Sequence, residues 1–443
     1  MKDKFSVCIV GGGSRYTPDL LKELVAVKKE FPLYRVSLYD NDEERQAKVG
    51  EYGKLLFEQF YPECEFLYTL DAQEAFEDID FAFMQIRAGG LKMREKDEKI
   101  ALKHGCIGQE TCGPGGFAYG LRSIPAVCDI IKDIRKYSKE AWVLNYSNPA
   151  AIVAEATKRV FPGDYRIINI CDQPIGQVMF YEILLGLPAG TIEATYFGLN
   201  HFGWFTHLYD KKTGKDYLPE VREILKKGID FDPESIGLDQ SHMNDLIFMS
   251  NIVRDYDEYL PNTYLQYYLY PNRIVKGMNP DYTRANEVMD GNEKEVFAML
   301  EEVKKTGKLD FDGSQDLLDV HGSYITDLAK AIAYNTHETF IFMTENHGII
   351  PNLTEGMMVE VLSRVGSSGI EPFNYGEIPT FYKGILENQF AYEKLAVDAC
   401  LEGNYQKALM ALVLNRCVND TDKAKELLDD YIVANKGYWP ELH

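Results

Sequence analysis

The sequence predicts an α/β fold, in which a Rossmann-like doubly wound parallel sheet is followed by an α+β domain with a helical C-terminus. Two observations predict this fold. In the first part of the chain, short apolar runs alternate with segments of helical periodicity, as in parallel strands joined by crossover helices. Farther along, longer helical segments dominate. We place the boundary after residue 195, which gives domains 1–195 and 196–443.

The expected strands of the first domain are apolar runs, several of which end in glycine or polar residues. They cover 5–10, 35–39, 80–86, 142–144 and 166–170. One expected helix begins at Thr17, with Pro18 in its first turn, and ends at residue 30, and another covers 152–160. The expected elements of the second part include strands at 195–199 and 339–343 and helices at 324–334 and 389–401.

The composition limits the class of protein. A chain of 443 residues exceeds one ordinary core, which favours two closely joined domains. A net charge of −22 argues against nucleic acid and anionic membranes as partners. Met1 leads almost directly into the first strand, without a signal peptide or membrane-spanning run. The 8 cysteines are scattered without a CxxC pair, so we expect a protein of the reducing cytoplasm.

A glycine-rich turn follows the first expected strand. Gly11, Gly12, Gly13 and Ser14 are small enough to let the backbone approach a pyrophosphate, and the next helix offers its N-terminus to that group. Tyr16 stands where a third glycine is usual, so a plain strand-to-helix turn is the alternative.

Asp40 strengthens the case for a dinucleotide. It ends the second expected strand, where an acidic side chain accepts the ribose hydroxyls and repels a 2′-phosphate. An ordinary turn or cap residue is the alternative for Asp40. Arg45 lies a few residues on, which leaves NADP open, but we favour NAD.

A cysteine and a histidine follow two of the expected strands. Cys171 comes directly after 166–170, and His201 comes shortly after 195–199. Because we expect these strand ends to be neighbours, the two side chains predict a site for one metal ion. Ligand softness favours zinc or iron. The alternatives are a small buried thiol and a hydrogen-bonded core histidine.

Other polar residues suit an anionic ligand or acid–base chemistry. Asp172 either donates a proton in catalysis or caps the helix that follows it. Arg87, Arg94 and Arg284 are candidates for binding a phosphate, although for each one an exposed arginine without a ligand is the commoner case. Residues 108–116 are dense in glycine, which predicts either a flexible connection or a binding loop.

Six motifs occur together, in order, along nearly the whole chain. They are Gly-Gly-Gly-Ser at 11–14, the loop at 108–116, Asn-Tyr-Ser-Asn-Pro at 145–149, Cys-Asp-Gln-Pro at 171–174, Gly-Leu-Asn-His-Phe-Gly-Trp at 198–204 and Asn-Thr-Tyr at 262–264. The set resembles glycoside hydrolase family 4, the NAD- and metal-dependent glycosidases. Asp172, after the cysteine, is similar to the family members that act on α-linked 6-phosphoglucosides. Arg15 is more typical of the branch that acts on β-linked ones.

The resemblance implies a role for each site residue. Cys171 and His201 would hold a divalent metal, Mn²⁺, in contrast to the zinc or iron that ligand softness favours. Asp172 would protonate the leaving oxygen, and Tyr264 would remove the proton at C2. Glu110 would raise the basicity of Tyr264 by accepting its hydrogen bond.

The resemblance also assigns the ligands to the two domains. Residues 1–195 would bind NAD through the glycine-rich turn and Asp40, and 196–443 would supply substrate, metal and subunit contacts. Substrate contacts would come from Arg94, Asn148 and Arg284, the arginines being suited to a phosphate. A homodimer or homotetramer is implied as well.

The implied reaction is net hydrolysis of maltose 6′-phosphate, or of an aryl 6-phosphoglucoside, to glucose 6-phosphate and glucose or the aglycone. It would proceed by NAD-dependent oxidation at C3, deprotonation at C2, elimination, water addition and re-reduction. The main alternatives are a 6-phospho-β-glucosidase of the same family and an NAD-dependent hydroxy-acid dehydrogenase. A catalytically inactive binding protein is disfavoured by the intact set Cys171, Asp172, His201 and Tyr264.

Overall fold

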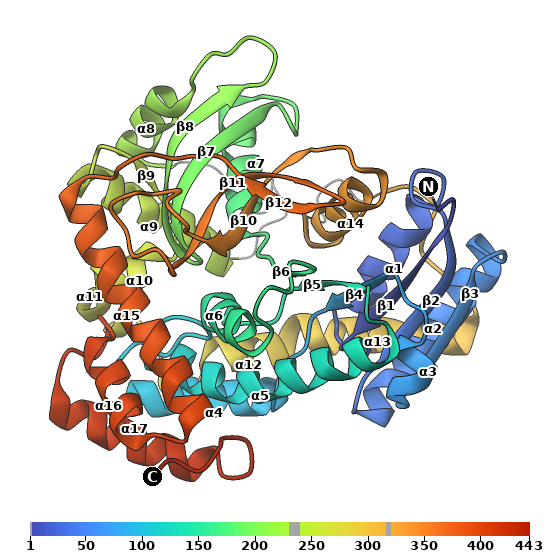
Figure 1. Ribbon diagram of the computed structural model, residues 1–443, viewed down its shortest axis with the longest axis horizontal. Coiled ribbons are helices and arrows are strands. Elements are labelled where there is room, and N and C mark those ends of the chain that lie inside the picture. Colours follow the sequence, from blue (N-terminus) through green and yellow to red (C-terminus); the bar gives the residue numbers. More distant parts are fainter. Residues whose placement is uncertain (1, 230–239, 316–319) are drawn as a thin grey trace.

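The computed structural model describes residues 2–229, 240–315 and 320–443 (Figure 1). Its first part is a parallel sheet of six strands in the order β3-β2-β1-β4-β5-β6. The strands are β1 (Phe5–Val10), β2 (Leu33–Tyr39), β3 (Glu65–Thr69), β4 (Phe81–Met84), β5 (Trp142–Asn145) and β6 (Ile167–Asn169). This is the strand order of the doubly wound fold. Successive strands are added toward one edge from β1 to β3 and toward the other edge from β4 to β6, so the switch point lies between β1 and β4. The predicted fold class is therefore confirmed.

The observed elements differ from the predicted ones mainly at their ends. β4 is shorter than the predicted 80–86, and the first helix ends at Ala26 rather than at residue 30. β3 was not predicted, because its five residues are partly or fully exposed and give no continuous apolar run.

Helices cover both faces of this sheet. Those that pack on it are α1 (Thr17–Ala26), α2 (Glu43–Phe60), α3 (Ala72–Phe76), α5 (Gly113–Tyr137) and α6 (Ala150–Val160). α4 (Gly90–Lys103) packs on α5, and α7 (Gln173–Leu185) packs into the core of the second part of the chain. Local sequence explains where several of them begin. Pro18 lies in the first turn of α1, and the Asp42 carboxylate accepts a hydrogen bond from the Arg45 amide at the start of α2, 3.1 Å away.

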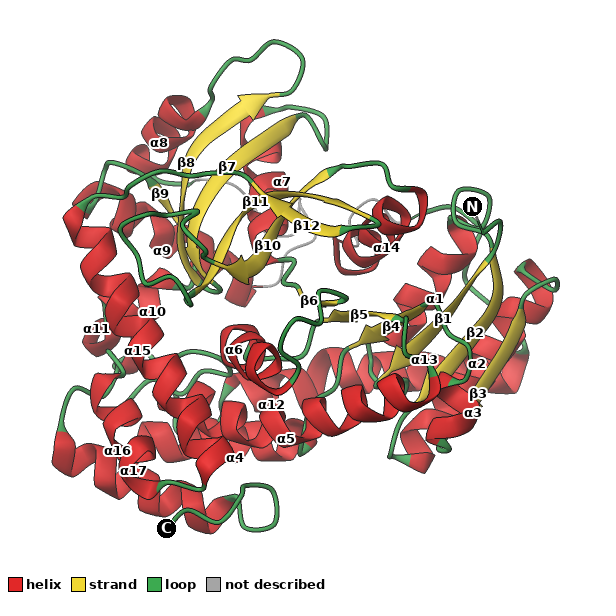
Figure 2. Cartoon of the chain, in the orientation of Figure 1, coloured by secondary structure: helices red, strands yellow, loops and turns green. Residues whose placement is uncertain are grey.

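The second part is built around an antiparallel sheet. Its strands run in the order β10-β11-β7-β8-β9, with β12 paired to β11. They are β7 (Ile192–Leu199), β8 (Phe202–Asp210), β9 (Leu260–Pro261), β10 (Thr339–Glu345), β11 (Met358–Gly366) and β12 (Gly369–Pro372). The helices of this part of the chain are α8 (Leu218–Lys227), α9 (Gln240–Asp255), α10 (Leu265–Leu269), α11 (Pro271–Val275), α12 (Arg284–Val288), α13 (Lys294–Thr306) and α14 (Val320–Tyr334). Of these, α12 packs on α4 rather than around this sheet. Figure 2 shows this second sheet above the first, with most of the helices around and below it.

Three helices end the chain: α15 (Thr380–Glu402), α16 (Tyr405–Leu414) and α17 (Thr421–Ala434). They pack against α4, α5 and α6 of the first part, at the lower left of Figure 1. Likewise α13 packs on α2, and α14 packs on α1. Leu20 and Leu24 of α1 thus share one core with Leu328 of α14 and Phe342 of β10. The two parts therefore complete each other's cores, and the boundary at 195 stays a prediction.

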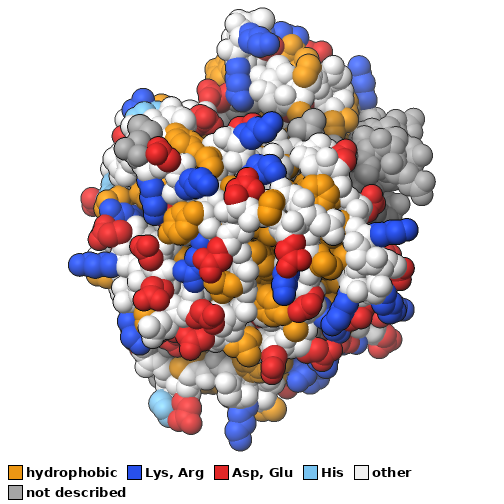
Figure 3. Space-filling view, turned by 90° about the vertical axis from the view of Figure 1, so that its right-hand side faces the viewer, with side chains coloured by type: hydrophobic (Ala, Val, Ile, Leu, Met, Phe, Trp, Pro, Cys, Tyr) orange, Lys and Arg blue, Asp and Glu red, His pale blue; other side chains and the backbone are white. Residues whose placement is uncertain are grey.

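The surface does not gather charge of one sign on the side seen in Figure 3. Lysines and arginines there are interspersed with aspartates and glutamates, between scattered apolar side chains. Within the described ranges, every helix is too short or too polar to span a bilayer.

Candidate active site

The turn between β1 and α1 brings the backbone unusually close to its neighbours. Gly11 has φ +87°, and a Cβ there would lie 2.9 Å from the Gln85 carbonyl oxygen. The amides of Gly11 and Gly12 both donate to the Tyr39 carbonyl, at 2.8 and 2.9 Å. No side chain caps the N-terminus of α1, so its first amides face the turn without a side-chain acceptor. This geometry suits a pyrophosphate.

Asp40 lies at the carboxyl end of β2, directly beside this turn. Its Oδ2 atom accepts a hydrogen bond from the Gly13 amide at 2.8 Å, and its Oδ1 atom accepts one from the Asp42 amide at 3.0 Å. The carboxylate is thereby held at the edge of the turn, where ribose hydroxyls would lie. Tyr16, at the place of the third glycine, is 40% exposed.

Cys171 and His201 meet, although not in the way the sequence suggested. The strands before them are not neighbours in one sheet, because β6 pairs with β5 in the first sheet and β7 pairs with β8 and β11 in the second. His201 lies in the tight turn between β7 and β8, with φ +61°. The two sheets nevertheless bring Cys171 Sγ within 3.4 Å of His201 Nε2. Two atoms that bind one ion at about 2.1–2.3 Å are separated by about 3–3.7 Å, so the pair fits a shared metal.

The His201 ring is oriented by Thr111. The Thr111 hydroxyl donates to Gln109 Oε1 at 3.2 Å, so its oxygen is free to accept from His201 Nδ1, 3.0 Å away. His201 Nε2 then presents its lone pair toward Cys171, as a metal ligand requires. Burial lowers the pKa of His201 to about 4, against the opposing charges of Glu110 and Asp172. The imidazole is therefore neutral at physiological pH.

The Cys171 thiol would need a cation to become a ligand. Burial, together with the charges of Asp172 and Glu360, raises its pKa well above the ordinary value. In the described ranges no group of three His, Cys, Asp or Glu side chains is placed to hold a metal. Cys171 and His201 thus form an open pair that leaves positions for other oxygens.

Tyr264 lies against the metal pair. Its ring stacks on the His201 ring, with centroids 4.0 Å apart and planes 14° apart. Burial, with the charges of Asp245 and Cys112, raises the pKa of Tyr264 well above its ordinary value. Its hydroxyl therefore needs a nearby positive charge before it can lose its proton.

Glu110 contacts two arginines instead of Tyr264. Its carboxylate pairs with Arg87 and with Arg94, whose Nη1 atom lies 2.8 Å away. Burial opposes the charge, but the two arginines lower the pKa of Glu110 to about 2. Over the described ranges, no hydrogen bond joins Glu110 to the Tyr264 hydroxyl, so the predicted hydrogen bond is not formed here.

Arg94 also reaches the segment that carries Arg284. Its Nε atom donates to Glu98 at 2.7 Å, and the other oxygen of Glu98 accepts from the Ala285 amide at 2.9 Å. Arg284, the first residue of α12, pairs with Glu287 at 2.9 Å. The start of α12 is thereby tied to α4, so the two segments that carry these predicted substrate arginines are adjacent.

Asn148 precedes Pro149 in the loop after β5. Its carbonyl oxygen accepts a hydrogen bond from the Ser123 hydroxyl at 2.8 Å. This bond ties the loop to α5 at the carboxyl edge of the first sheet, where ligands of doubly wound folds bind.

His321 is a site residue that the sequence analysis missed. Its Nδ1 atom lies 2.9 Å from Asp172 Oδ2, and its Nε2 atom lies 3.3 Å from Gln85 Oε1. No local motif marks it, since only the packing of α14 on α1 brings it to this place. Asp172 makes no side-chain cap at α7, so the alternative of a helix cap is wrong.

The pKa of Asp172 follows from this contact. Burial would raise the pKa, but the hydrogen bond and charge of His321 outweigh burial, and the pKa lies below its ordinary value. Before it can act as an acid, Asp172 must therefore take up a proton.

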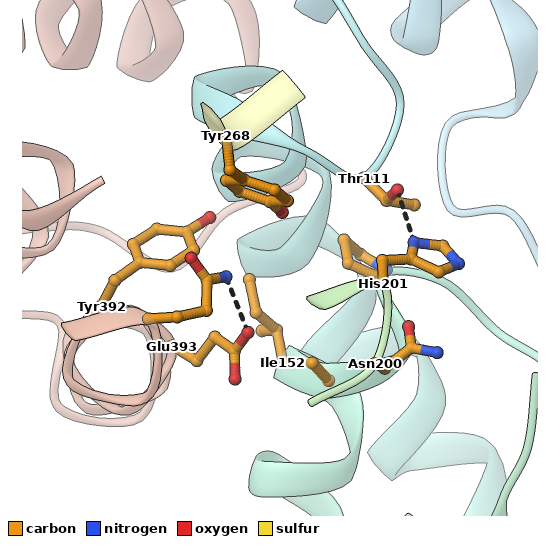
Figure 4. A pocket seen from close by; sticks show the side chains of 10 residues that line it. Thr111, Ile152, Asn200, His201, Tyr268, Tyr392 and Glu393 are labelled. Carbon is orange, nitrogen blue, oxygen red and sulfur yellow. Dashed lines mark hydrogen bonds between the residues drawn. The ribbon is translucent and has the colours of Figure 1, made fainter. Parts of the chain in front are cut away.

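A small pocket opens behind His201 (Figure 4). Thr111, Asn200 and His201 lie at one end, and Tyr392 and Glu393 lie at the other. Glu393 is only 4% exposed and accepts a hydrogen bond from the Gln389 amide at 2.8 Å. Burial, opposed by that bond, raises the pKa of Glu393 to about 8.

The raised pKa of Glu393 should make the free energy of unfolding depend on pH. The folded pKa of Glu393 lies above its ordinary value of 4.5, so the folded protein keeps a proton that the unfolded chain loses between these values. Its contribution to stability is full at low pH and is lost as the pH rises toward 8. We therefore expect Glu393→Gln to stabilise the protein more at about pH 9 than at about pH 5. The two effects on the free energy of unfolding should differ by on the order of 2 kcal/mol.

Thermal and urea denaturation at the two pH values measure this difference. The exposed Glu63→Gln variant, with the same change of charge, is the control and should show no such difference. A pH-independent effect of Glu393→Gln would contradict the assignment.

Comparisons with known proteins agree along the whole chain. A model of family 4 glycosyl hydrolases matches residues 6–187, and a model of that family's C-terminal domain matches 196–418. The phospho-alpha-glucosidase PagL of Clostridium acetobutylicum is 63% identical over 443 residues, which cover 99% of this chain and 100% of the relative. A probable 6-phospho-beta-glucosidase of Bacillus subtilis is 31% identical over 454 residues, covering 100% of this chain and 99% of its own.

Two solved structures of 6-phospho-alpha-glucosidases from gut microorganisms superpose over their full length. One, in complex with NAD and Mn²⁺, has a TM-score of 0.97 and 50% identity, with 100% of both chains covered. The other, in complex with NAD and glucose 6-phosphate, has a TM-score of 0.95 and 41% identity, again with 100% of both chains covered.

Proposed function

Because this chain belongs to family 4 of the glycosyl hydrolases, we propose that it hydrolyses α-linked 6-phosphoglucosides such as maltose 6′-phosphate. The products are glucose 6-phosphate and glucose, or the aglycone of an aryl substrate. The assignment of activity on the α linkage rests on the full-length identity of 63% to a phospho-alpha-glucosidase, against 31% to a probable 6-phospho-beta-glucosidase. The 6-phospho-β-glucosidase alternative is accordingly less supported, in spite of Arg15.

NAD and a divalent metal, Mn²⁺, are the cofactors of this reaction, and both are bound in a structural neighbour. When bound, they supply hydride exchange at C3 of the sugar and Lewis-acid polarisation of the oxygen there. The turn at Gly11, Gly12, Gly13 and Ser14, with Asp40, would hold the dinucleotide. Cys171 and His201 would hold the metal, which their facing donor atoms support.

Tyr264 would remove the proton at C2 of the oxidised sugar. Its stacking on His201 supports a position beside the proposed metal, whose charge would favour the phenolate against burial. Asp172, in its acid form, would then protonate the oxygen that leaves C1. Glu110 would act on Tyr264 through its charge and not through a hydrogen bond, since its carboxylate is held by Arg87 and Arg94.

Arg94, Arg284 and Asn148 would hold the phosphorylated sugar. Arginine suits a phosphate because its forked donors make paired, charge-assisted hydrogen bonds. A local basic group is also needed because the chain as a whole carries a net charge of −22. We further propose that the protein is cytoplasmic, which its eight free, buried cysteines support. A homodimer or homotetramer is proposed from the family resemblance.

The test compares release of nitrophenol from three nitrophenyl glucosides: the α-linked 6-phosphate, the β-linked 6-phosphate and the unphosphorylated α-glucoside. Each is assayed with and without NAD⁺ and Mn²⁺ under reducing conditions. We expect cleavage of the α-linked 6-phosphate alone, dependent on both additions and without net formation of NADH. Preference for the β-linked compound would move the chain to the other branch. NADH accumulation on a hydroxy acid, without cleavage, would make it a dehydrogenase.

A further inference from the structure

His321 is held in one orientation by its surroundings. Its ring lies between Tyr146, at 4.1 Å and 28°, and Tyr16, at 5.0 Å and 29°. The Gln85 side chain is fixed in turn, because its amide nitrogen donates to the Thr17 hydroxyl at 2.9 Å. The Gln85 oxygen therefore faces the ring as an acceptor, and the His321 Nε2 atom donates to it.

This arrangement directs the other ring nitrogen at Asp172. Among the residues described, His321 is the side chain hydrogen bonded to the Asp172 carboxyl, and α7 makes no cap bond with it. This hydrogen bond holds the Oδ2 atom of the carboxyl in place and so limits the rotation of the Asp172 side chain.

We propose that His321 is a positioning residue, which holds the Asp172 carboxyl toward the oxygen that leaves C1. The inference rests on the proposed function, because it assigns the support of the acid in that reaction. Misplacing an acid matters only where the leaving oxygen needs a proton. His321 should therefore matter for a sugar leaving group and little for a nitrophenolate, which is stable without a proton.

Two variants separate the hydrogen bond from the ring. His321→Phe keeps a flat ring between the two tyrosines but loses both hydrogen bonds. His321→Asn loses the ring but places an amide near the position of Nδ1, within reach of Asp172. Both are assayed with NAD⁺ and Mn²⁺ on maltose 6′-phosphate and on 4-nitrophenyl α-glucoside 6-phosphate.

We expect His321→Phe to lower kcat on maltose 6′-phosphate about tenfold or more, and to lower it less than about threefold on the nitrophenyl substrate. The KM values should stay within about twofold of wild type. His321→Asn should recover most of the loss on maltose 6′-phosphate. The NADH dissociation constant, from a fluorescence titration, and the Tm should match wild type in both variants, which shows that the site is intact.

Equal losses on both substrates, or no loss on maltose 6′-phosphate, would overturn the positioning role. If the Phe variant fails to fold, His321→Gln replaces it, since its amide lies near Gln85 rather than Asp172, and the same Asn–Gln contrast is required. Failure of the wild-type enzyme on maltose 6′-phosphate would instead refute the proposed function, before any variant is made.

Discussion

Replacing Asp172 by Asn should lower kcat/KM on maltose 6′-phosphate by about 10²–10⁴-fold, the usual contribution of a general acid. The amide has nearly the same shape as the carboxyl and can still contact His321, but it has no labile proton to donate. On 4-nitrophenyl α-glucoside 6-phosphate the loss should be less than about tenfold, because nitrophenolate leaves without protonation. Coupled assays of glucose and direct assays of nitrophenol measure the two rates.

A matched control is Asp129→Asn, which makes the same change of charge on an exposed part of α5. It should leave both rates within about twofold of wild type, as is usual for surface substitutions. If Asp172→Asn lowers both rates equally, Asp172 acts before the bond to the leaving group breaks, and its role as the acid is wrong.

Replacing Cys171 by Ser should weaken Mn²⁺ binding about 100-fold or more, because it removes one of two protein donors from the proposed site. Cleavage of both substrates should fall in parallel. Mn²⁺ retained after desalting, measured by electron paramagnetic resonance, tests the affinity independently of catalysis. NADH binding should be unchanged, since Cys171 is not part of the glycine-rich turn.

Cys64→Ser is the matched control, because Cys64 is also buried, at 5% exposure, but lies in the core of the first sheet. It should retain Mn²⁺ as wild type does, even where its Tm falls. If Cys171→Ser binds Mn²⁺ with wild-type affinity, the metal is held elsewhere.

Local sequence patterns predicted most of the elements of the first sheet. Apolar runs with polar ends located five of the six strands of the first sheet, and Pro18 marked the start of α1. β3 was missed because half-exposed strands have no distinctive pattern of burial. The meeting of Cys171 with His201 was predicted, but from a wrong picture of neighbouring strands, since the two belong to different sheets.

The unpredicted part of the site consists of contacts across long stretches of chain. His321 reaches Asp172 across 149 positions, and its place depends on how α14 packs on α1. Nothing in the residues around His321 encodes that packing. The pairing of Glu110 with Arg87 and Arg94 is similar, because all three residues were named but the family resemblance gave Glu110 a hydrogen bond to Tyr264 instead.

The packing of α13 to α17 on the first part of the chain has a consequence for biosynthesis. The apolar face of α1, with Leu20 and Leu24, packs on β1 and α2 but is not fully covered until α14 has left the ribosome. The apolar faces of α5 and α6 that pack on α15 to α17 stay exposed longer still, until these last helices have been made. The nascent chain therefore carries an unfinished dinucleotide fold with exposed apolar surface through most of its translation. Such exposed surface makes the unfinished chain prone to aggregation until its last helices have been made.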